Sequence, residues 1–137
     1  MVSGVIFVDT GAFYARAMRS DAHHTLALAT WPKLDALRVY TSNLVLCETA
    51  ELLLRRADAH FAASCVSAIL AEEKLTILRP GADEEHTALE LMLKFSDQPI
   101  GFVDCVSMVL MKKQRIRRVF SFDRHFRTAG FTLWPQT

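Results

Sequence analysis

Five short apolar runs, separated by longer stretches of helical character, restrict the fold of this chain more than any other sequence feature. The runs are rich in β-branched and aromatic residues and occupy residues 5–8, 39–41, 75–78, 118–123 and 131–134. Between them, stretches such as residues 58–73 place apolar side chains at helical spacing. Strands that alternate with helices pair in parallel, because each helix spans the distance between two strands of the same direction. The sequence therefore predicts an α/β fold, a three-layer α/β/α sandwich on a mainly parallel sheet of about five strands.

Length and composition are those of one folded domain. A chain of 137 residues (1–137) with 51% hydrophobic residues buries a core that needs no disulfide or structural metal. The three cysteines, Cys47, Cys65 and Cys105, are far apart and without zinc spacing, which is typical of reduced thiols in a cytoplasmic protein. No apolar run approaches the roughly 18 residues that cross a bilayer, and no secretory leader precedes the first run. We therefore expect a single cytoplasmic domain without a membrane segment.

Two aspartates stand at the ends of predicted strands. Asp9 directly follows the run at residues 5–8, and Asp123 closes the fourth run. In open α/β sheets, ligands bind at the carboxyl ends of the strands, so both side chains are candidates for a site. A structural explanation exists for Asp9, since it can cap a helix over residues 12–19. Thr10 can provide that cap instead, which leaves Asp9 free.

Two further acids lie in apolar surroundings. Asp104 interrupts the apolar run at residues 103–111, where an ionised carboxylate without a partner costs several kcal/mol. It must therefore be protonated, cap a helix or face a positive charge. Glu48 lies in a predicted helix and has no oppositely charged neighbour at helical spacing, unlike Glu51, which has Arg55 four residues later.

Local structure thus leaves four acids unexplained: Asp9, Glu48, Asp104 and Asp123. If the fold brings them together, their mutual repulsion raises their pKa values unless a divalent cation offsets it. The set contains hard carboxylate oxygens and no cysteine or histidine, which favours Mg²⁺ or Mn²⁺ over zinc. Such a site is completed by phosphate oxygens of the substrate and suits metal-assisted hydrolysis of a phosphodiester by water. Asp97, in a predicted loop, is either a loop residue or an outer ligand.

Basic residues concentrate near the carboxyl terminus. Seven of the chain's 16 lysines and arginines fall within residues 112–127, where Asp123 is the only acid. A basic cluster beside a carboxylate site suits the phosphate backbone of a nucleic acid, with Lys112, Arg118 and Arg124 as candidate contacts. The alternative is a solvated face that is basic without a function.

Four segments carry a recognisable pattern in this order along the chain: FVDT (7–10), TSNLVLCET (41–49), GFVDCVS (101–107) and SFDRHF (121–126) followed by Gly130-Phe131. Together they span nearly the whole chain and resemble the PIN-domain ribonucleases, most of all the VapC-type toxins of prokaryotic toxin–antitoxin pairs. The resemblance implies a PIN-like endoribonuclease that depends on Mg²⁺ or Mn²⁺ and forms homodimers. It also implies inhibition by an antitoxin whose tail lies near the active site.

Matched position by position, the resemblance implies a metal site formed by four acids: Asp9, Glu48, Asp104 and Asp123. It implies Thr10 and Ser121 as small polar neighbours of this site. We add Ser107, which lies three residues after Asp104 and shares its helical face. Our hypothesis is that Asp9, Asp104 and Asp123 hold the principal ion. Glu48 then holds a second ion or orients the attacking water.

The chain also departs from the family pattern, and other functions remain open. Gly101 and Val103 stand where small hydroxyl residues are frequent, and Arg115 where a glycine often ends the helix. A DNA nuclease or a phosphatase can use the same carboxylates, although aspartyl-phosphate phosphatases need a second aspartate where this chain has Gly11. A non-catalytic module that binds nucleic acid or a protein partner through its basic residues is the other alternative.

Overall fold

A five-stranded sheet forms the middle of the computed structural model, which describes residues 4–135. The strand order is β3-β2-β1-β4-β5, and every neighbouring pair is parallel. The strands are β1 (Val5–Val8), β2 (Arg38–Ser42), β3 (Leu75–Leu78), β4 (Arg118–Phe120) and β5 (Thr132–Trp134). The expected α/β class with a parallel five-stranded sheet is confirmed. The fourth strand is shorter than expected and ends at Phe120, because the residues after it turn toward β1.

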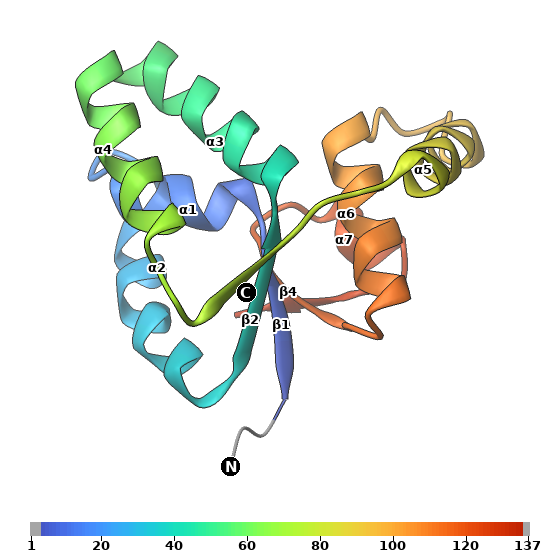
Figure 1. Cartoon of the computed structure of the whole chain (residues 1–137), viewed down its shortest axis with the longest axis horizontal. Coiled ribbons are helices and arrows are strands. Elements are labelled where there is room, and N and C mark those ends of the chain that lie inside the picture. The colour runs from blue at the N-terminus through green and yellow to red at the C-terminus, as the bar shows by residue number, and fades with distance from the viewer. Residues whose placement is uncertain (1–3, 136–137) are drawn as a thin grey trace.

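Helices cover both faces of the sheet and produce the layers seen in Figure 1. On one side lie α1 (Thr10–Ala17), α2 (His24–Thr30), the 3-10 helix η1 (Trp31–Ala36), α3 (Asn43–Arg56) and α4 (Ala59–Leu70). On the other side lie α5 (Ala82–Lys94), α6 (Phe102–Lys113) and α7 (His125–Thr128). Right-handed crossovers explain this division, since the chain crosses the sheet in one direction up to β3 and in the other direction after it. None of these helices, within the described part of the chain, is long and apolar enough to span a membrane.

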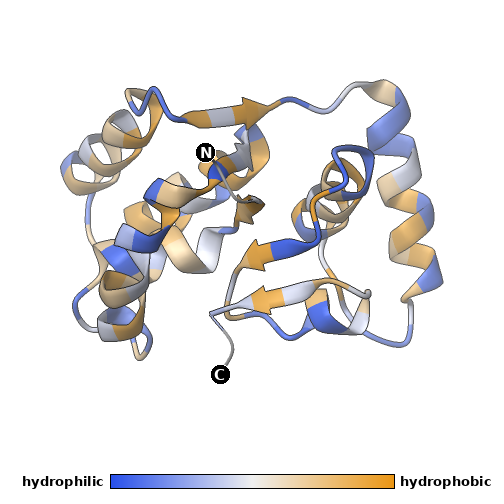
Figure 2. Cartoon of the chain, turned by 90° about the horizontal axis from the view of Figure 1, so that it is seen from below, coloured by the Kyte–Doolittle hydropathy of each residue, from blue (hydrophilic) through white to orange (hydrophobic). Residues whose placement is uncertain are grey.

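The core is centred on β1, which has a neighbouring strand on each side. Ile6, Phe7 and Val8 are completely buried, and Phe7 is aligned with Tyr40 of β2 and Val119 of β4. A strand covered by helices on both faces needs apolar residues at consecutive positions, which explains why this run does not alternate. Figure 2 shows the same distribution across the molecule, with hydrophobic residues along the strands and many hydrophilic residues on the helices.

Helix α6 ends without the glycine that the family pattern favours. Arg115 adopts a left-handed conformation with φ of 59°. The N–H of Ile116 donates to Met111 O at 2.8 Å, a hydrogen bond that closes the carboxyl end of a helix. A left-handed residue other than glycine costs about 1–2 kcal/mol. The helix therefore stops where the family pattern places its end, at a modest cost in stability.

The carboxyl ends of β1 and β4 meet where the chain changes its direction across the sheet. The chain passes from β1 to β2 and β3 on one side, and then crosses to β4 and β5 on the other. The crevice at such a point is where open α/β sheets bind ligands. Asp9 directly follows β1, and Ser121 directly follows β4. Both therefore lie at the position where the topology predicts a site.

Candidate metal centre

Asp9 lies at the carboxyl end of β1 with one carboxylate oxygen unpaired. Its backbone N–H donates to Phe120 O at 3.0 Å, which holds this turn against β4. Oδ2 accepts a hydrogen bond from Ser121 Oγ at 2.9 Å, whereas Oδ1 has no hydrogen-bond partner among the described residues. The residue is only 4% exposed, and its side chain makes no capping hydrogen bond to α1. Capping therefore does not explain Asp9, and a buried oxygen is left free for a ligand.

Helices α3 and α6 bring two further acids to the same place. Asp104 lies in the first turn of α6, and Glu48 lies near the middle of α3. The two helices contact each other. One carboxylate oxygen from each of Asp9, Glu48 and Asp104 lies within 4.8 Å of the other two. Asp9 is buried, Asp104 is half-buried and Glu48 is exposed, so the group is open to solvent at Glu48.

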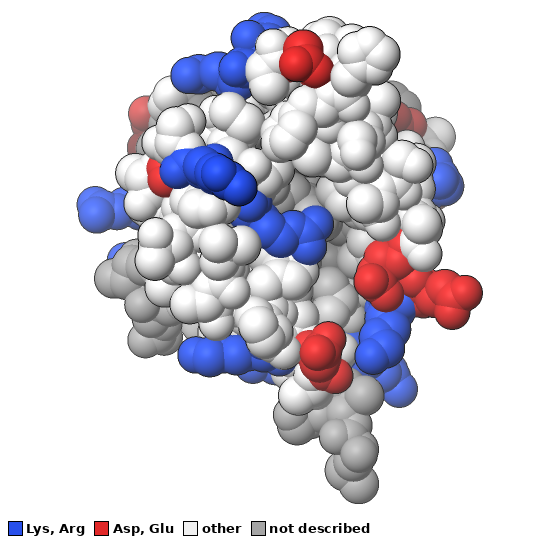
Figure 3. All heavy atoms as spheres, turned by 90° about the vertical axis from the view of Figure 1, so that its left-hand side faces the viewer, with Lys and Arg blue, Asp and Glu red and all other residues white. Residues whose placement is uncertain are grey.

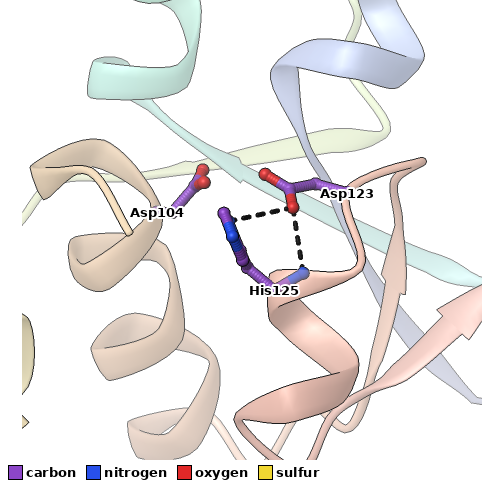
Figure 4. Close-up of side chains that lie close together, drawn as sticks. All are labelled: Asp104, Asp123 and His125. Atoms are coloured by element: carbon purple, nitrogen blue, oxygen red, sulfur yellow. Dashed lines mark hydrogen bonds and ion pairs between the residues drawn. The ribbon is translucent and has the colours of Figure 1, made fainter. Parts of the chain in front are cut away.

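A second group forms around Asp104 on the side of β4. One ligand atom from each of Asp104, Asp123 and His125 lies within 4.8 Å of the other two (Figure 4). The backbone N–H of Asp123 donates to Ser121 Oγ at 3.1 Å, so Ser121 contacts both Asp9 and Asp123. Because Asp104 belongs to both groups, the fold brings together all four acids that local structure leaves unexplained.

His125 is the member of this site that the sequence did not lead us to include. Its backbone N–H donates to Asp123 Oδ1 at 2.9 Å, and its ring Nδ1 lies 3.1 Å from the same oxygen. The signal lies in the SFDRHF segment, where the histidine follows the aspartate by two residues at the start of α7. An aspartate that accepts the backbone N–H two residues later forms a tight turn, and here that turn brings the imidazole to the carboxylate.

Burial and mutual repulsion hold the pKa values of Asp9 and Asp104 high. Burial is the main cause that raises the pKa of Asp9 from 3.8 to about 7, and the Ser121 hydrogen bond partly opposes it. The pKa of Asp104 rises from 3.8 to about 9, mainly through burial and then through the charges of Asp9 and Asp123. Among residues 4–135, no lysine or arginine nitrogen lies within 4.0 Å of any of the four acids.

A divalent cation fits this arrangement. The unpaired, buried Oδ1 of Asp9 is an oxygen that a cation can satisfy. The remaining donors are mostly carboxylates, which are the ligands that hard ions such as Mg²⁺ take. A cation placed among them also offsets the repulsion that raises the pKa of Asp104. The residues of this chain are therefore suited to hold a metal ion.

The three small polar neighbours contribute unequally. The Ser121 hydroxyl donates to Asp9 and accepts from the backbone of Asp123. Thr10 is buried, but its hydroxyl donates to Val45 O at 3.5 Å, which connects α1 to α3. Ser107 is completely buried one turn after Asp104, and its Oγ has no hydrogen-bond partner in the described residues. Ser121 is thus the neighbour that holds the acids directly.

The three basic residues expected to contact RNA lie at different distances from the acids. Arg124 directly follows Asp123 and is exposed. Lys112 lies on α6 two turns beyond Asp104, which is about 12 Å along the helix axis. Arg118 begins β4, and its guanidinium lies against Gly4 at the amino end of the sheet. Arg124 is therefore the neighbour of Asp123 in the sequence and has an exposed side chain, whereas Lys112 and Arg118 lie away from the acids.

A separate cavity lies among α1, η1, α4 and β2. It has a volume of about 470 Å³ and apolar walls that include Phe13, Leu34 and Ile69. The guanidinium carbon of Arg16 lies 3.8 Å from the ring centroid of Trp31 in this wall. Figure 3 shows this side of the molecule, with a basic side chain at the edge of a central hollow and acidic side chains to the right of it. None of the four acids is among the described residues that line the cavity, so it is distinct from the acidic site.

The fold and the acidic site together define the class of this protein. Residues 6–132 match the PIN domain family, and this match includes all four acids. The chain therefore belongs to the PIN domain family, and the resemblance carried by its sequence motifs is confirmed.

Among its relatives is the 23S rRNA-specific endonuclease VapC20 of Mycobacterium tuberculosis. The two chains are 36% identical over 127 residues, which cover 93% of this chain and 95% of VapC20. The crystal structure of VapC20, a sarcin–ricin loop cleaving toxin, matches this fold with a TM-score of 0.86 at 34% identity, covering 93% and 96% of the two chains. PAE2754 from Pyrobaculum aerophilum shares the fold with a TM-score of 0.64 at 18% identity, covering 93% and 87%.

Proposed function

We propose that this chain is a metal-dependent endoribonuclease, the toxin of a type II toxin–antitoxin pair, which hydrolyses RNA phosphodiester bonds with water as the nucleophile. The observation that carries the proposal is a cluster of four carboxylates with no lysine or arginine beside it in the described part of the chain. The similarity to a 23S rRNA-specific endonuclease over 93% of the chain supports RNA as the substrate. We take 23S rRNA as the first substrate to test.

In this proposal, the metal ligands are the four acids Asp9, Glu48, Asp104 and Asp123, and the ion is Mg²⁺ or Mn²⁺. When bound, such an ion supplies Lewis-acid activation of water and stabilises negative charge at the scissile phosphate. Ser121 keeps Asp9 and Asp123 in position through hydrogen bonds of 2.9 and 3.1 Å. Glu48 is the exposed carboxylate of the set, which suits it to orient the attacking water.

Digestion of ribosomal RNA, single-stranded DNA and a small phosphomonoester by the purified chain tests the proposed reaction. We expect cleavage of the RNA alone, abolished by EDTA and restored by excess Mg²⁺ or Mn²⁺, because the carboxylates need the ion to act on a phosphate. Comparable cleavage of DNA would contradict an RNA substrate, and hydrolysis of the monoester would indicate a phosphatase. Binding of RNA without cleavage, unaffected by EDTA, would favour a non-catalytic module.

Arg124→Ala should raise the KM for RNA about tenfold with little change in kcat, the loss expected for one charge-assisted hydrogen bond to a phosphate. Lys112→Ala is the matched control, because it removes a basic residue two turns along α6 from Asp104. It should change KM by less than about threefold. Steady-state kinetics at one salt concentration measures both variants. Equal effects would mean that the basic residues act only through the total charge of the chain.

We also propose that the protein acts in the cytoplasm as a homodimer and is inhibited by a cognate antitoxin. The similarity to VapC20, a toxin, supports an antitoxin partner, and exposed apolar side chains offer surface for protein contacts. Among the described residues, the exposed large ones are Leu26, Leu28, Leu54, Phe61, Leu70, Leu89 and Leu93. Light scattering of the purified chain, alone and with the product of a small reading frame just upstream, measures both associations. A monomer that remains monomeric and active in this mixture would contradict the proposal.

A further inference from the structure

Asp104 connects two groups of donors whose chemistry differs. With Asp9 and Glu48 it forms a group that offers only oxygen, and with Asp123 and His125 it forms a group that offers oxygen and nitrogen. In each group the ligand atoms lie within 4.8 Å of one another. Figure 4 shows the second group, in which the side chains of Asp104, Asp123 and His125 face a common space.

The contacts between Asp123 and His125 leave one donor atom of each residue available. Oδ1 of Asp123 accepts the backbone N–H of His125 at 2.9 Å and lies 3.1 Å from the ring Nδ1. In its neutral form the imidazole keeps a lone pair on one of its two ring nitrogens, and this is the atom that a cation takes. Oδ2 of Asp123 takes part in neither contact.

We propose that Asp104, Asp123 and His125 form a second cation position that prefers Mn²⁺ to Mg²⁺, beside an all-oxygen position formed by Asp9, Glu48 and Asp104. Asp104 bridges the two positions. The inference rests on the metal-dependent function proposed above and adds to it a nitrogen ligand and a metal preference. It also assigns Asp123 to the second cation position, instead of to the principal ion that Asp9 holds.

The type of ligand decides the preference. Mg²⁺ keeps several waters and binds through carboxylates, whereas imidazole nitrogen is a ligand for transition-metal ions. An independent observation indicates a cation at the adjoining position, since Asp9 Oδ1 is buried and unpaired among the described residues. A cation on the side of His125 then offsets the remaining repulsion between Asp104 and Asp123.

Binding of Mn²⁺ to the full chain tests this inference without a cleavage assay. The electron paramagnetic resonance signal of free Mn²⁺ gives the number of ions bound, and electron spin echo modulation detects a nitrogen ligand directly. We expect about two Mn²⁺ per chain. We also expect a nitrogen modulation that changes when the protein is produced with isotope-labelled histidine.

His125→Gln should remove this modulation. It should also lower the affinity for one of the two Mn²⁺ ions about 10–100-fold. The affinity for Mg²⁺, measured by competition, should change by less than about threefold, because a carboxylate site does not need the imidazole. His60→Gln is the matched control, since His60 is exposed on α4 and belongs to neither donor group. It should change neither the modulation nor the number of ions.

A wild-type chain without nitrogen modulation, or a His125→Gln variant that keeps it, would overturn the inference. An equal loss of Mn²⁺ and Mg²⁺ affinity would also overturn it, because losing a histidine that only positions Asp123 lowers the affinity for both ions alike. None of these three results contradicts the proposed nuclease function as long as RNA cleavage depends on metal. A chain that binds no Mn²⁺ and cuts RNA in EDTA would contradict both proposals.

Discussion

Replacing Asp104 with asparagine should lower kcat for RNA cleavage at least about 10³-fold and at the same time stabilise the metal-free protein. Asp104 belongs to both donor groups, so the substitution removes a ligand from each. Loss of a residue that merely supports a metal ligand commonly costs about 10–100-fold, and a shared ligand costs more. Asparagine keeps the shape of the side chain and is neutral without the proton that the folded chain must hold on Asp104 beside Asp9 and Asp123.

Asp97→Asn makes the same chemical change outside the site and serves as the control. Asp97 is exposed between α5 and α6 and belongs to neither donor group. We expect kcat within about twofold of the wild type and an unchanged unfolding temperature in EDTA. Loss of activity in this variant would instead make Asp97 an outer ligand. Full activity in Asp104→Asn, measured beside it, would remove the acidic cluster from the mechanism.

The metal-free chain should lose stability as the pH rises from about 4 to about 9, by several kcal/mol in total. Folding raises the pKa of Asp9 from 3.8 to about 7 and that of Asp104 from 3.8 to about 9. Between these values the folded chain keeps protons that the unfolded chain has released, so the free energy of unfolding falls with increasing pH. The part due to Asp9 is complete near pH 7, and the part due to Asp104 continues to about pH 9.

Urea unfolding in EDTA at about pH 5 and about pH 8 measures this loss. A cation binds the ionised carboxylates, so Mg²⁺ or Mn²⁺ should restore most of the lost stability at the higher pH and little at the lower one. The variant Asp104→Asn should show a flatter dependence above about pH 7, where Asp104 is the acid that still titrates. Equal stability at both pH values in EDTA, or an equal gain from metal at both, would contradict the metal centre.

Much of the fold was predictable because its signals are local. The run Val5–Val8 is apolar at consecutive positions and short, which fits a strand covered on both faces. Strands separated by helices then leave few topologies open. The end of β4 was not predictable, because Ser121, Phe122 and Asp123 continue the alternation of polar and apolar residues that is typical of a strand. They leave the sheet for a turn in which Ser121 donates to Asp9 and accepts the backbone N–H of Asp123.

The sequence by itself determined the α/β class, the PIN family pattern and the four acids that lack a local partner, since spacing along the chain reveals periodicity and helical neighbours. Tertiary structure alone decided how those acids are grouped, that Asp104 is shared between the groups, and that His125 belongs beside Asp123. It also placed Arg118 at the amino end of the sheet, away from the acids. The physical reason is that distances between side chains on different elements are set by crossovers and packing, which no spacing along the sequence records.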